Sequence, residues 1–485
     1  MTPPASKSEH GKSITRFQKI VWFRNDLRVY DNPALYRAAE DEQGVLAVYF
    51  ICRDFIKNHV VAPARVDFIR RHLLLLNQDL AELNIPLLVF DVENVSEVIP
   101  QLQLLISKYN VEQLFFNAEY PIDEFERDKK VAEVLRAQGV IVKRFHDRVM
   151  IPPGMVRNGK GEPYKVFTAF KNNWLEQVRG LELQPLKKPK LQPAHKVAHL
   201  GDDAINQLFA NLELRDLSSL WPAGEKEASK RLKQFVKNRI EGYQTARDFP
   251  NQDGTSQLSP YLAIGSISPR QCIAAALQAN NGELDSGNAG VTTWISELIW
   301  RDFYQHVVVD FPSVCKFKAM QKHTEAFPWK YDQKLFDAWC NGETGVPIVD
   351  AAMLQLKETG WMHNRLRMVV AMYLTKNLQI DWRMGEHYFM TQLIDGDFPA
   401  NNGGWQWSAS TGTDAAPYFR IFNPISQSQR FDPEGAFIKG YLPALKHLPA
   451  KLIHNPPPTP GYPLPIVDLS TSRKETIALF SALKA

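Results

Sequence analysis

The fold is decided near the start of the chain by the stretch Ile20-Val21-Trp22-Phe23-Arg24-Asn25-Asp26, a short apolar run that ends in polar residues. Such a run is too short for a helix and predicts a strand that is buried on both faces. Comparable runs occupy residues 45–51, 86–90, 113–116 and 140–142. The sequence therefore predicts five strands within the first third of the chain.

The segments between these runs are amphipathic and long enough for crossover helices. Residues 66–83 carry an isoleucine and several leucines at alternating steps of four and three, which places them on one face of a helix. Residues 125–138 are also helix-like. Strands that alternate with such helices predict a five-stranded parallel, doubly wound sheet.

Ligands of doubly wound sheets bind at the carboxyl ends of the strands. Polar residues follow the predicted strands at Arg24-Asn25-Asp26, His59 and Asn117-Ala118-Glu119. No Gly-x-Gly-x-x-Gly follows the first strand, so the usual dinucleotide fingerprint is missing.

In the rest of the chain the spacing of apolar residues changes twice. Residues 146–225 contain many prolines and the basic run Lys187-Lys188-Pro189-Lys190, which we interpret as a solvated part of a long linker in preference to a nucleic-acid patch. Helical spacing begins at about residue 226; one helix is expected from Pro347 to a stop at Gly360. The predicted domains are a flexible tail (1–19), an α/β domain (20–145), a linker (146–225), an all-helical domain (226–450) and a C-terminal tail (451–485).

Composition excludes several classes of protein. Apolar residues make up 44% of the chain and charged residues 23%, and no apolar run approaches the roughly 20 residues of a membrane span. The four cysteines are irregularly spaced, which predicts neither a disulfide framework nor a metal clip and favours a reducing compartment, the cytoplasm. A net charge of +4 permits an anionic partner without requiring one.

Aromatic and basic residues concentrate in the helical part. Eight of the eleven tryptophans lie between Trp294 and Trp407, interleaved with arginines. A lone tryptophan is usually a packing residue, but aromatic rings beside arginines also suit bases and phosphates. The pattern favours a site for nucleic acid or for a nucleotide cofactor.

Polar residues in otherwise apolar segments mark a second feature of this region. Asp395 needs a cation if it is buried, and Arg367 is the candidate; a structural ion pair and a functional role are equally consistent with the sequence. The stretch Gly254-Thr255-Ser256-Gln257-Leu258-Ser259 offers hydroxyl and backbone N–H groups before a helix-like run, an arrangement suited to a pyrophosphate.

Four further motifs carry a resemblance to a known family. Trp22-Phe23-Arg24-Asn25-Asp26-Leu27-Arg28 resembles the opening of the photolyase and cryptochrome family. The likeness continues in Trp361-Met362-His363-Asn364-Arg365-Leu366-Arg367-Met368, in Asp395-Gly396-Asp397 with Ala400-Asn401-Asn402-Gly403-Gly404-Trp405-Gln406-Trp407, and in residues 414–424. It extends over about residues 20–450.

The resemblance implies FAD in the helical domain. Asn401 would face the redox-active ring nitrogen, where an amide can hydrogen-bond a reduced ring without adding charge. Trp405, Trp382 and Trp329 would relay electrons from the flavin to the surface. The residues implied to bind FAD are Tyr243, Thr255, Ser256, Gln257, Leu258, Ser259, Arg301, Asn364, Arg367, Asp395, Gly396, Asp397 and Asn401.

The resemblance also implies a substrate, UV-damaged DNA bound with little dependence on sequence. Glu297 and Trp300, one helical turn apart, would contact a flipped-out pyrimidine dimer, with Asn364 and Asn401 on the catalytic side. The predicted phosphate and groove contacts are Arg365, Trp407 and Arg420. The expected activity is light-driven repair of cyclobutane pyrimidine dimers by a monomer in a bacterial cytoplasm, with no metal ion.

Two alternatives stay open at this point. A cryptochrome would be a signalling photoreceptor, but members with that role usually carry a long C-terminal extension. Enzymes for the (6-4) photoproduct typically show a histidine pair where this chain has His363-Asn364. A second, antenna chromophore is also implied; methenyltetrahydrofolate is preferred to a deazaflavin because His59, Asn117, Cys315 and Lys316 resemble positions that contact the folate.

Overall fold

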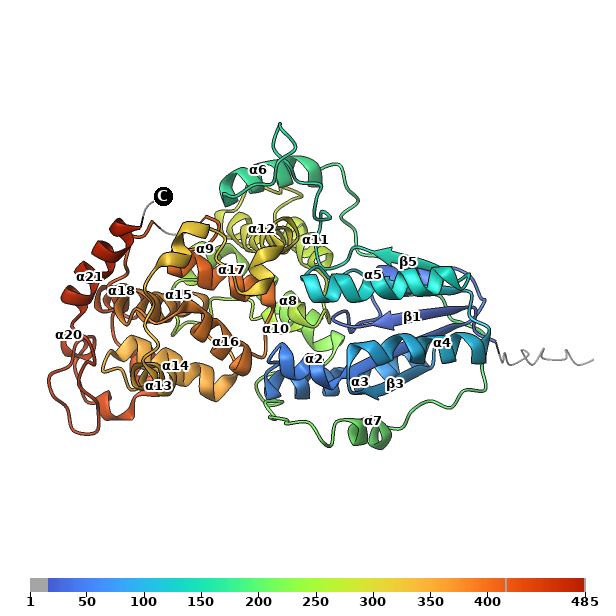
Figure 1. Cartoon of the computed structure of the whole chain (residues 1–485), viewed down its shortest axis with the longest axis horizontal. Coiled ribbons are helices and arrows are strands. Elements are labelled where there is room, and N and C mark those ends of the chain that lie inside the picture. Colours follow the sequence, from blue (N-terminus) through green and yellow to red (C-terminus); the bar gives the residue numbers. More distant parts are fainter. Residues whose placement is uncertain (1–15, 415–416, 484–485) are drawn as a thin grey trace, which may run out of the picture.

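A computed structural model describes residues 16–414 and 417–483 of the chain. An α/β part and a larger helical part lie side by side in it (Figure 1). The α/β part is built on one parallel sheet with strand order β3-β2-β1-β4-β5, which confirms the predicted doubly wound sheet. The strands are β1 (Lys19–Phe23), β2 (Val45–Cys52), β3 (Leu87–Val92), β4 (Gln113–Asn117) and β5 (Ile141–Phe145).

Helices cover both faces of this sheet. Side chains alternate along β1, so Ile20 and Trp22 enter the apolar core on one face while Val21 and Phe23 enter the core on the other. The two helices expected at 66–83 and 125–138 are α3 and α5. The helices of this part are α1 (Pro33–Ala38), α2 (Arg53–Asn58), α3 (Pro63–Ala81), α4 (Val98–Tyr109) and α5 (Ile122–Ala137).

The helical part surrounds two apolar cores and contains the helix expected after Pro347. That helix, α14, has Pro347 in its first turn and ends at Gly360, whose φ of 66° favours glycine. The helices are α8 (Glu225–Asn238), α9 (Tyr243–Ala246), α10 (Ser259–Ala263), α11 (Pro269–Ala279), α12 (Ala289–Asp310), α13 (Gln333–Asn341), α14 (Pro347–Thr359), α15 (Asn364–Met372), α16 (Trp382–Gln392), α17 (Phe398–Ala409), α18 (Pro424–Phe431), α19 (Ala436–Tyr441), α20 (Ala450–Ile453) and α21 (Leu469–Ala482).

Three segments differ from their sequence-based description. The stretch 146–225 contains two helices, α6 (Phe167–Val178) and α7 (Asp202–Leu208), and α6 belongs to the core of the helical part. Where the sequence predicts a C-terminal tail, α21 packs on the helical part and its Phe480 is 5% exposed. Of the predicted N-terminal tail, residues 1–15 lie outside the described residues, and Phe17 is buried.

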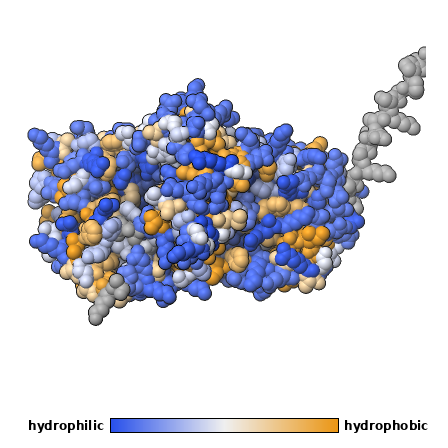
Figure 2. Space-filling view, turned by 90° about the horizontal axis from the view of Figure 1, so that it is seen from above, coloured by the Kyte–Doolittle hydropathy of each residue, from blue (hydrophilic) through white to orange (hydrophobic). Residues whose placement is uncertain are grey.

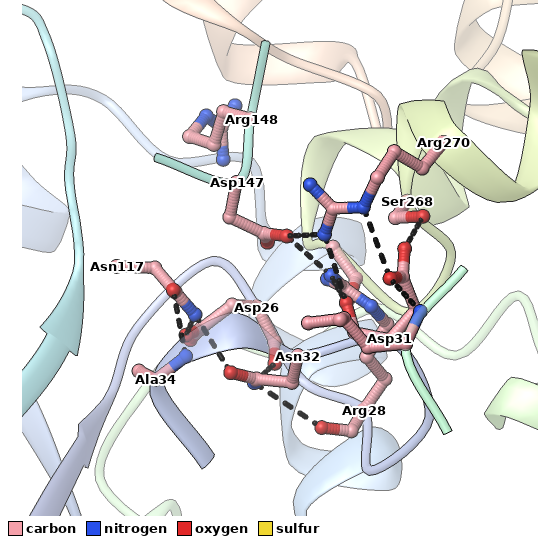
Figure 3. A network of polar contacts seen from close by, with 12 residues as sticks. Asp26, Arg28, Asp31, Asn32, Ala34, Asn117, Asp147, Arg148, Ser268 and Arg270 are labelled. Carbon is pink, nitrogen blue, oxygen red and sulfur yellow. Dashed lines mark hydrogen bonds and ion pairs between the residues drawn. The ribbon is translucent and has the colours of Figure 1, made fainter. Parts of the chain in front are cut away.

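The loop after β1 fastens the two parts together (Figure 3). Arg28 is buried and donates hydrogen bonds to Asp147 and to the backbone oxygen of Gly265. Arg270, at the start of α11, donates to Asp31 at 3.0 Å and to Asp147 at 3.3 Å. Gly265 lies so close to the loop that a Cβ atom there would be 2.2 Å from the backbone oxygen of Asn25. Much of the opening motif therefore fixes the α/β part in position against the helical part.

We expect Arg270→Ala to lower the free energy of unfolding by about 1–3 kcal/mol, because it removes a donor from a buried carboxylate that keeps other partners. A urea titration measures the loss. Arg179→Ala is the matched control: it breaks an ion pair to Asp285 whose side chains are 55% and 37% exposed, worth about 1 kcal/mol or less. Equal losses in the two variants would contradict an interdomain role for this network.

Among the helices in the described ranges, none combines the length and the hydropathy of a membrane span. The face seen in Figure 2 is mostly hydrophilic, with hydrophobic residues in small separate groups.

Candidate active site

A cavity of about 440 Å³ lies where the carboxyl ends of the strands meet the helical part. Two of the four predicted antenna residues line it: His59 from the α/β part, and Cys315 from the segment after α12. Asn117 instead points into the buried network, where its amide donates to Asp26 at 2.6 Å. Lys316 is exposed and is not among the lining residues.

His59 has an aromatic and an acidic neighbour in this cavity. Its ring stacks on Phe55 with centroids 4.0 Å apart, and its Nε2 lies 3.6 Å from a carboxylate oxygen of Asp123. Burial lowers the pKa of His59 in spite of Asp123. The imidazole is therefore mainly neutral near pH 7 and offers a ring face and a hydrogen bond to a bound molecule.

The predicted phosphate-binding stretch follows α9 and runs into the first turn of α10. Gly254 packs on the backbone of Ala246, where a Cβ would be 2.5 Å from the carbonyl oxygen. Ser259 is exposed, and its hydroxyl accepts a hydrogen bond of 3.1 Å from the indole of Trp361. Thr255 and Ser256 are half-buried, so three hydroxyls are accessible on this stretch.

Two of the residues that are predicted to lie beside the phosphates are held within the protein, Tyr243 by burial and Arg301 by hydrogen bonds. Tyr243 is buried, and burial raises the pKa of its phenol. Arg301 donates hydrogen bonds to the backbone oxygens of Arg148 and Leu262, and burial lowers the pKa of its guanidinium. An arginine guanidinium stays cationic in proteins, so Arg301 contributes positive charge beside Leu262 of α10.

The pair predicted between Asp395 and Arg367 is confirmed, with 2.7 Å between Oδ2 and the guanidinium nitrogen. Arg367 also donates to the backbone oxygen of Met362 at 2.9 Å. The other oxygen of Asp395, Oδ1, is buried and has no partner within the described ranges. A buried, unpaired carboxylate oxygen is costly and fits a ligand that donates a hydrogen bond, such as a flavin ring N–H or a ribose hydroxyl.

Asp397 and Asn401 lie on the side of α17 that faces the cavity residue Glu386. Asp397 pairs with Arg148 at 2.6 Å and itself lines the cavity. Asn401 donates to the backbone oxygen of Glu386 at 3.0 Å, which fixes the orientation of its amide. Gly396 is buried, whereas Asn364, the first residue of α15, is exposed.

Glu386 is a residue that sequence reasoning missed. It is 2% exposed, accepts a hydrogen bond from Asn402 at 2.8 Å, and burial raises the pKa of its carboxyl to about 7. Glu386 is the one carboxylate in the sequence of α16, so no spacing between acidic residues marks it as a site residue. The structure places it between the cavity and the predicted flavin-facing asparagine.

The predicted substrate residues share one face of α12, as expected from their spacing. Glu297 and Trp300 are half-buried, and Glu297 forms an ion pair of 2.6 Å with Arg247 of the chain before the phosphate stretch. Tyr304, one turn further, packs against Gly403 so closely that a Cβ there would be 2.1 Å from its ring. This contact joins α12, which carries the predicted substrate residues, to α17, which carries Asn401.

The other predicted DNA contacts differ in how accessible they are. Arg365 is paired with Asp248 at 2.5 Å and lies over the ring of Phe431 at 4.5 Å. Arg420 is exposed, and Trp407 is half-buried.

The three predicted relay tryptophans lie along neighbouring segments. Trp405 is 2% exposed and packs on Gly385 of α16. Gly385 lies one turn after Trp382, which is fully buried. Residue Lys330 pairs with Ile380 through the backbone, which brings Trp329 beside the start of α16. Trp329 is half-buried, packed on Phe327 and Phe480, so it is less exposed than a surface loop would make it.

In comparisons with known proteins, both halves of the chain match models of photolyase domains. The family model "DNA photolyase" matches residues 19–191, and the model "FAD binding domain of DNA photolyase" matches residues 294–482. The deoxyribodipyrimidine photo-lyase of Vibrio cholerae is 43% identical over 96% of this chain and 100% of its own, and that of Escherichia coli 42% identical over 96% and 98%.

Solved structures agree over almost the whole length. A class III photolyase from Agrobacterium tumefaciens has a TM-score of 0.86 at 32% identity, covering 98% of this chain and 99% of its own. A cryptochrome from Synechocystis has a TM-score of 0.84 at 28% identity, covering 96% and 99%. An archaeal photolyase from Sulfolobus tokodaii, solved with two FAD molecules, has a TM-score of 0.79 at 30% identity, covering 96% and 99%.

Proposed function

This chain belongs to the DNA photolyase family, and from that premise we propose that it is a deoxyribodipyrimidine photo-lyase, which repairs cyclobutane pyrimidine dimers in DNA with light and FAD. The observation that carries the proposal is the packing of α12 on α17. It joins the helix of Glu297 and Trp300 to the helix of Asn401, so that groups suited to damaged bases adjoin groups suited to a flavin.

The residues divide the work of holding FAD by their chemistry. Thr255, Ser256 and Ser259 offer hydroxyls to the phosphates, and Arg301, which donates to the backbone of Leu262 in α10, adds positive charge. Asp395, oriented by Arg367, offers Oδ1 to a donor on the cofactor. The chemistry that bound, reduced FAD supplies is the transfer of one electron to the dimer on excitation by light and its return after the ring opens, so no net redox change results. The other residues that we propose to contact FAD are Tyr243, Gln257, Leu258, Asn364, Gly396 and Asp397.

Asn401 serves as a neutral partner for the redox-active ring. Its amide nitrogen is used by the backbone of Glu386, which leaves the amide oxygen to accept a hydrogen bond from a ring N–H. A neutral acceptor stabilises a reduced ring without the repulsion that a carboxylate would add. The neighbouring carboxyl of Glu386, with its pKa raised to about 7 by burial, is partly protonated near neutral pH.

Glu297 and Trp300 receive the damage. The carboxylate of Glu297 is held by Arg247 and accepts hydrogen bonds from base N–H groups, while the ring of Trp300 packs against the dimer. Extruding a normal base costs a few kcal/mol, and a dimer costs less because its stacking and pairing are already weakened. The enzyme selects damage in this way with little dependence on sequence.

The cavity at the sheet is the proposed seat of the antenna chromophore. His59 and Cys315 line it, as the resemblance to folate-binding relatives implies, and we favour methenyltetrahydrofolate over a deazaflavin. An absorption spectrum of the purified protein separates the two by their bands beside those of the flavin. The enzyme is proposed to act as a single chain on the chromosome in a bacterial cytoplasm.

Repair of the (6-4) photoproduct is disfavoured by His363. The ring is 2% exposed and accepts the backbone N–H of Arg365 at 3.2 Å, as the N-cap of α15. Burial, with Arg365 nearby, lowers the pKa of His363 to about 4, so the imidazole is uncharged near pH 7. Its Nδ1 caps the helix, so the neutral ring keeps its proton on Nε2 and is not the charged imidazolium that a strong acid would require.

The test uses duplex oligonucleotides with either one cyclobutane dimer or one (6-4) photoproduct. Enzyme with fully reduced flavin should restore the first in blue light and leave the second unchanged. Repair of the (6-4) lesion alone would contradict the proposal, and repair of neither would favour a photoreceptor.

We expect binding of dimer-containing DNA to weaken steeply with salt, with a slope of about −0.9 per phosphate neutralised. Arg420→Ala should reduce that slope by about 1, because Arg420 is exposed and available to a phosphate. Arg179→Ala, which changes an arginine paired with Asp285, serves as the control. An unchanged slope in Arg420→Ala would place the DNA backbone elsewhere.

A further inference from the structure

The stretch between the two domains supplies a ring to the substrate face. Phe167, the first residue of α6, lies face to face with Trp300, with ring centroids 3.6 Å and planes 8° apart. Phe167 is 7% exposed, whereas Trp300 is half-buried. One face of the indole is therefore covered by Phe167, and the remaining surface is what a dimer can meet.

The backbone of the same short stretch also holds Thr413 and Asp414. The carbonyl oxygen of Lys165 accepts hydrogen bonds from the Thr413 hydroxyl and, at 2.9 Å, from the Asp414 N–H. The N–H of Phe167 donates to the carboxylate of Asp414, which lies at the N-terminal end of α6, where the helix dipole favours negative charge.

Asp414 adopts a backbone conformation that it would seldom take alone. Its φ is 47°, in the left-handed region that residues other than glycine rarely occupy. Such a conformation persists where surrounding contacts determine it, and the contacts here come from Lys165 and Phe167. The conformation of Asp414 is thus set by residues about 250 positions earlier in the chain.

We infer that Phe167 is a positioning residue for damage recognition, because its ring fixes that of Trp300. The inference rests on the proposed function, which gives Trp300 its contact with damaged DNA. A ring that is fixed before binding loses less conformational entropy when the dimer packs on it.

The test compares Phe167→Leu with wild type as FAD-loaded enzymes in the dark. The dissociation constant is measured for a duplex with one cyclobutane dimer and for the same duplex undamaged. We expect the first to rise about tenfold and the second less than about twofold, since the variant removes an aromatic pair used only with damage. Repair per absorbed photon at saturating DNA should stay at the wild-type value, because Phe167 acts only through Trp300.

Phe170→Leu is the matched control on the same helix. Phe170 lies one turn further along α6, is 1% exposed, and pairs with Phe303 and His306 at 5.0 Å each. It should lower the melting temperature to a similar extent while discrimination between the two duplexes is kept. An equal loss of discrimination in both variants would overturn the inference and leave Phe167 a packing residue.

Trp300→Leu separates the inference from the function on which it rests. In a Trp300→Leu background, Phe167→Leu should cause no further change in affinity for the dimer duplex. If Trp300→Leu alone leaves that affinity unchanged, the substrate role of Trp300 fails. If Trp300→Leu weakens binding and Phe167→Leu does not, the positioning role of Phe167 alone is overturned.

Discussion

Holoenzyme that carries Trp382→Phe is expected to keep its oxidised-flavin spectrum under blue light and an external reductant, whereas the wild type loses that spectrum. Trp382 is fully buried at the start of α16. Trp405 packs on Gly385 of that helix, and the backbone pairing of Lys330 with Ile380 brings Trp329 to the same end. Phenylalanine fills most of the same space but is much harder to oxidise, so the path should be cut while the fold survives.

The matched control for this variant is Trp339→Phe. Trp339 is also fully buried and also touches Trp405, with ring centroids 6.0 Å apart, but it donates its N–H to the backbone of Val370 within the core. Its replacement should leave photoreduction intact. After treatment with dithionite both variants should repair dimers as the wild type does, since repair needs only reduced flavin and substrate. Photoreduction of Trp382→Phe at the wild-type rate would make Trp382 a packing residue.

Asp395→Ala should purify largely without flavin, with the dissociation constant for FAD raised by about 100- to 4,000-fold. The change leaves Arg367 without its carboxylate and removes the unpaired oxygen Oδ1 from the proposed flavin site. Breaking a buried ion pair costs about 3–5 kcal/mol, and each 1.4 kcal/mol corresponds to a factor of ten in affinity. Flavin absorbance per protein, followed through dialysis, measures the loss.

Two further variants distinguish loss of a ligand contact from loss of stability. Asp310→Ala breaks an ion pair with Arg157 in which the carboxylate is 8% exposed, at the far end of α12, and should retain its flavin. Asp395→Asn keeps a hydrogen-bond acceptor and should bind FAD more tightly than Asp395→Ala. Wild-type flavin content in Asp395→Ala would mean that Asp395 serves only as the structural partner of Arg367, the alternative that the sequence left open.

The sequence predicts the sheet well because its strands are nearly continuous apolar runs, and such runs have few other conformations when they are bounded by polar residues. It also predicts the pair between Asp395 and Arg367, since an aspartate in a buried segment requires a cation. Both predictions depend on which segments are buried, and the pattern of apolar residues along the sequence reveals this.

Periodicity does not reveal which distant segments meet. Phe167 lies in a stretch that reads as a linker, and nothing in its neighbourhood indicates that α6 enters the core beside Trp300. Arg247 and Glu386 are single charges without a spacing pattern, and their roles follow from tertiary contacts with Glu297 and Asn401. α21 was predicted as part of a tail because the prolines before it obscure a helix whose stability depends on packing.

In the proposed activity, light drives catalytic repair by reduced FAD without consuming the reductant. The direct measurement is made on holoenzyme whose flavin has been fully reduced and kept without oxygen, mixed with an excess of a duplex that carries one cyclobutane dimer. Under blue light each enzyme molecule should restore many dimers while the spectrum of the reduced flavin stays unchanged, and no repair should occur in the dark. Repair in the dark, or repair that stops after one dimer per flavin with the flavin left oxidised, would contradict the account.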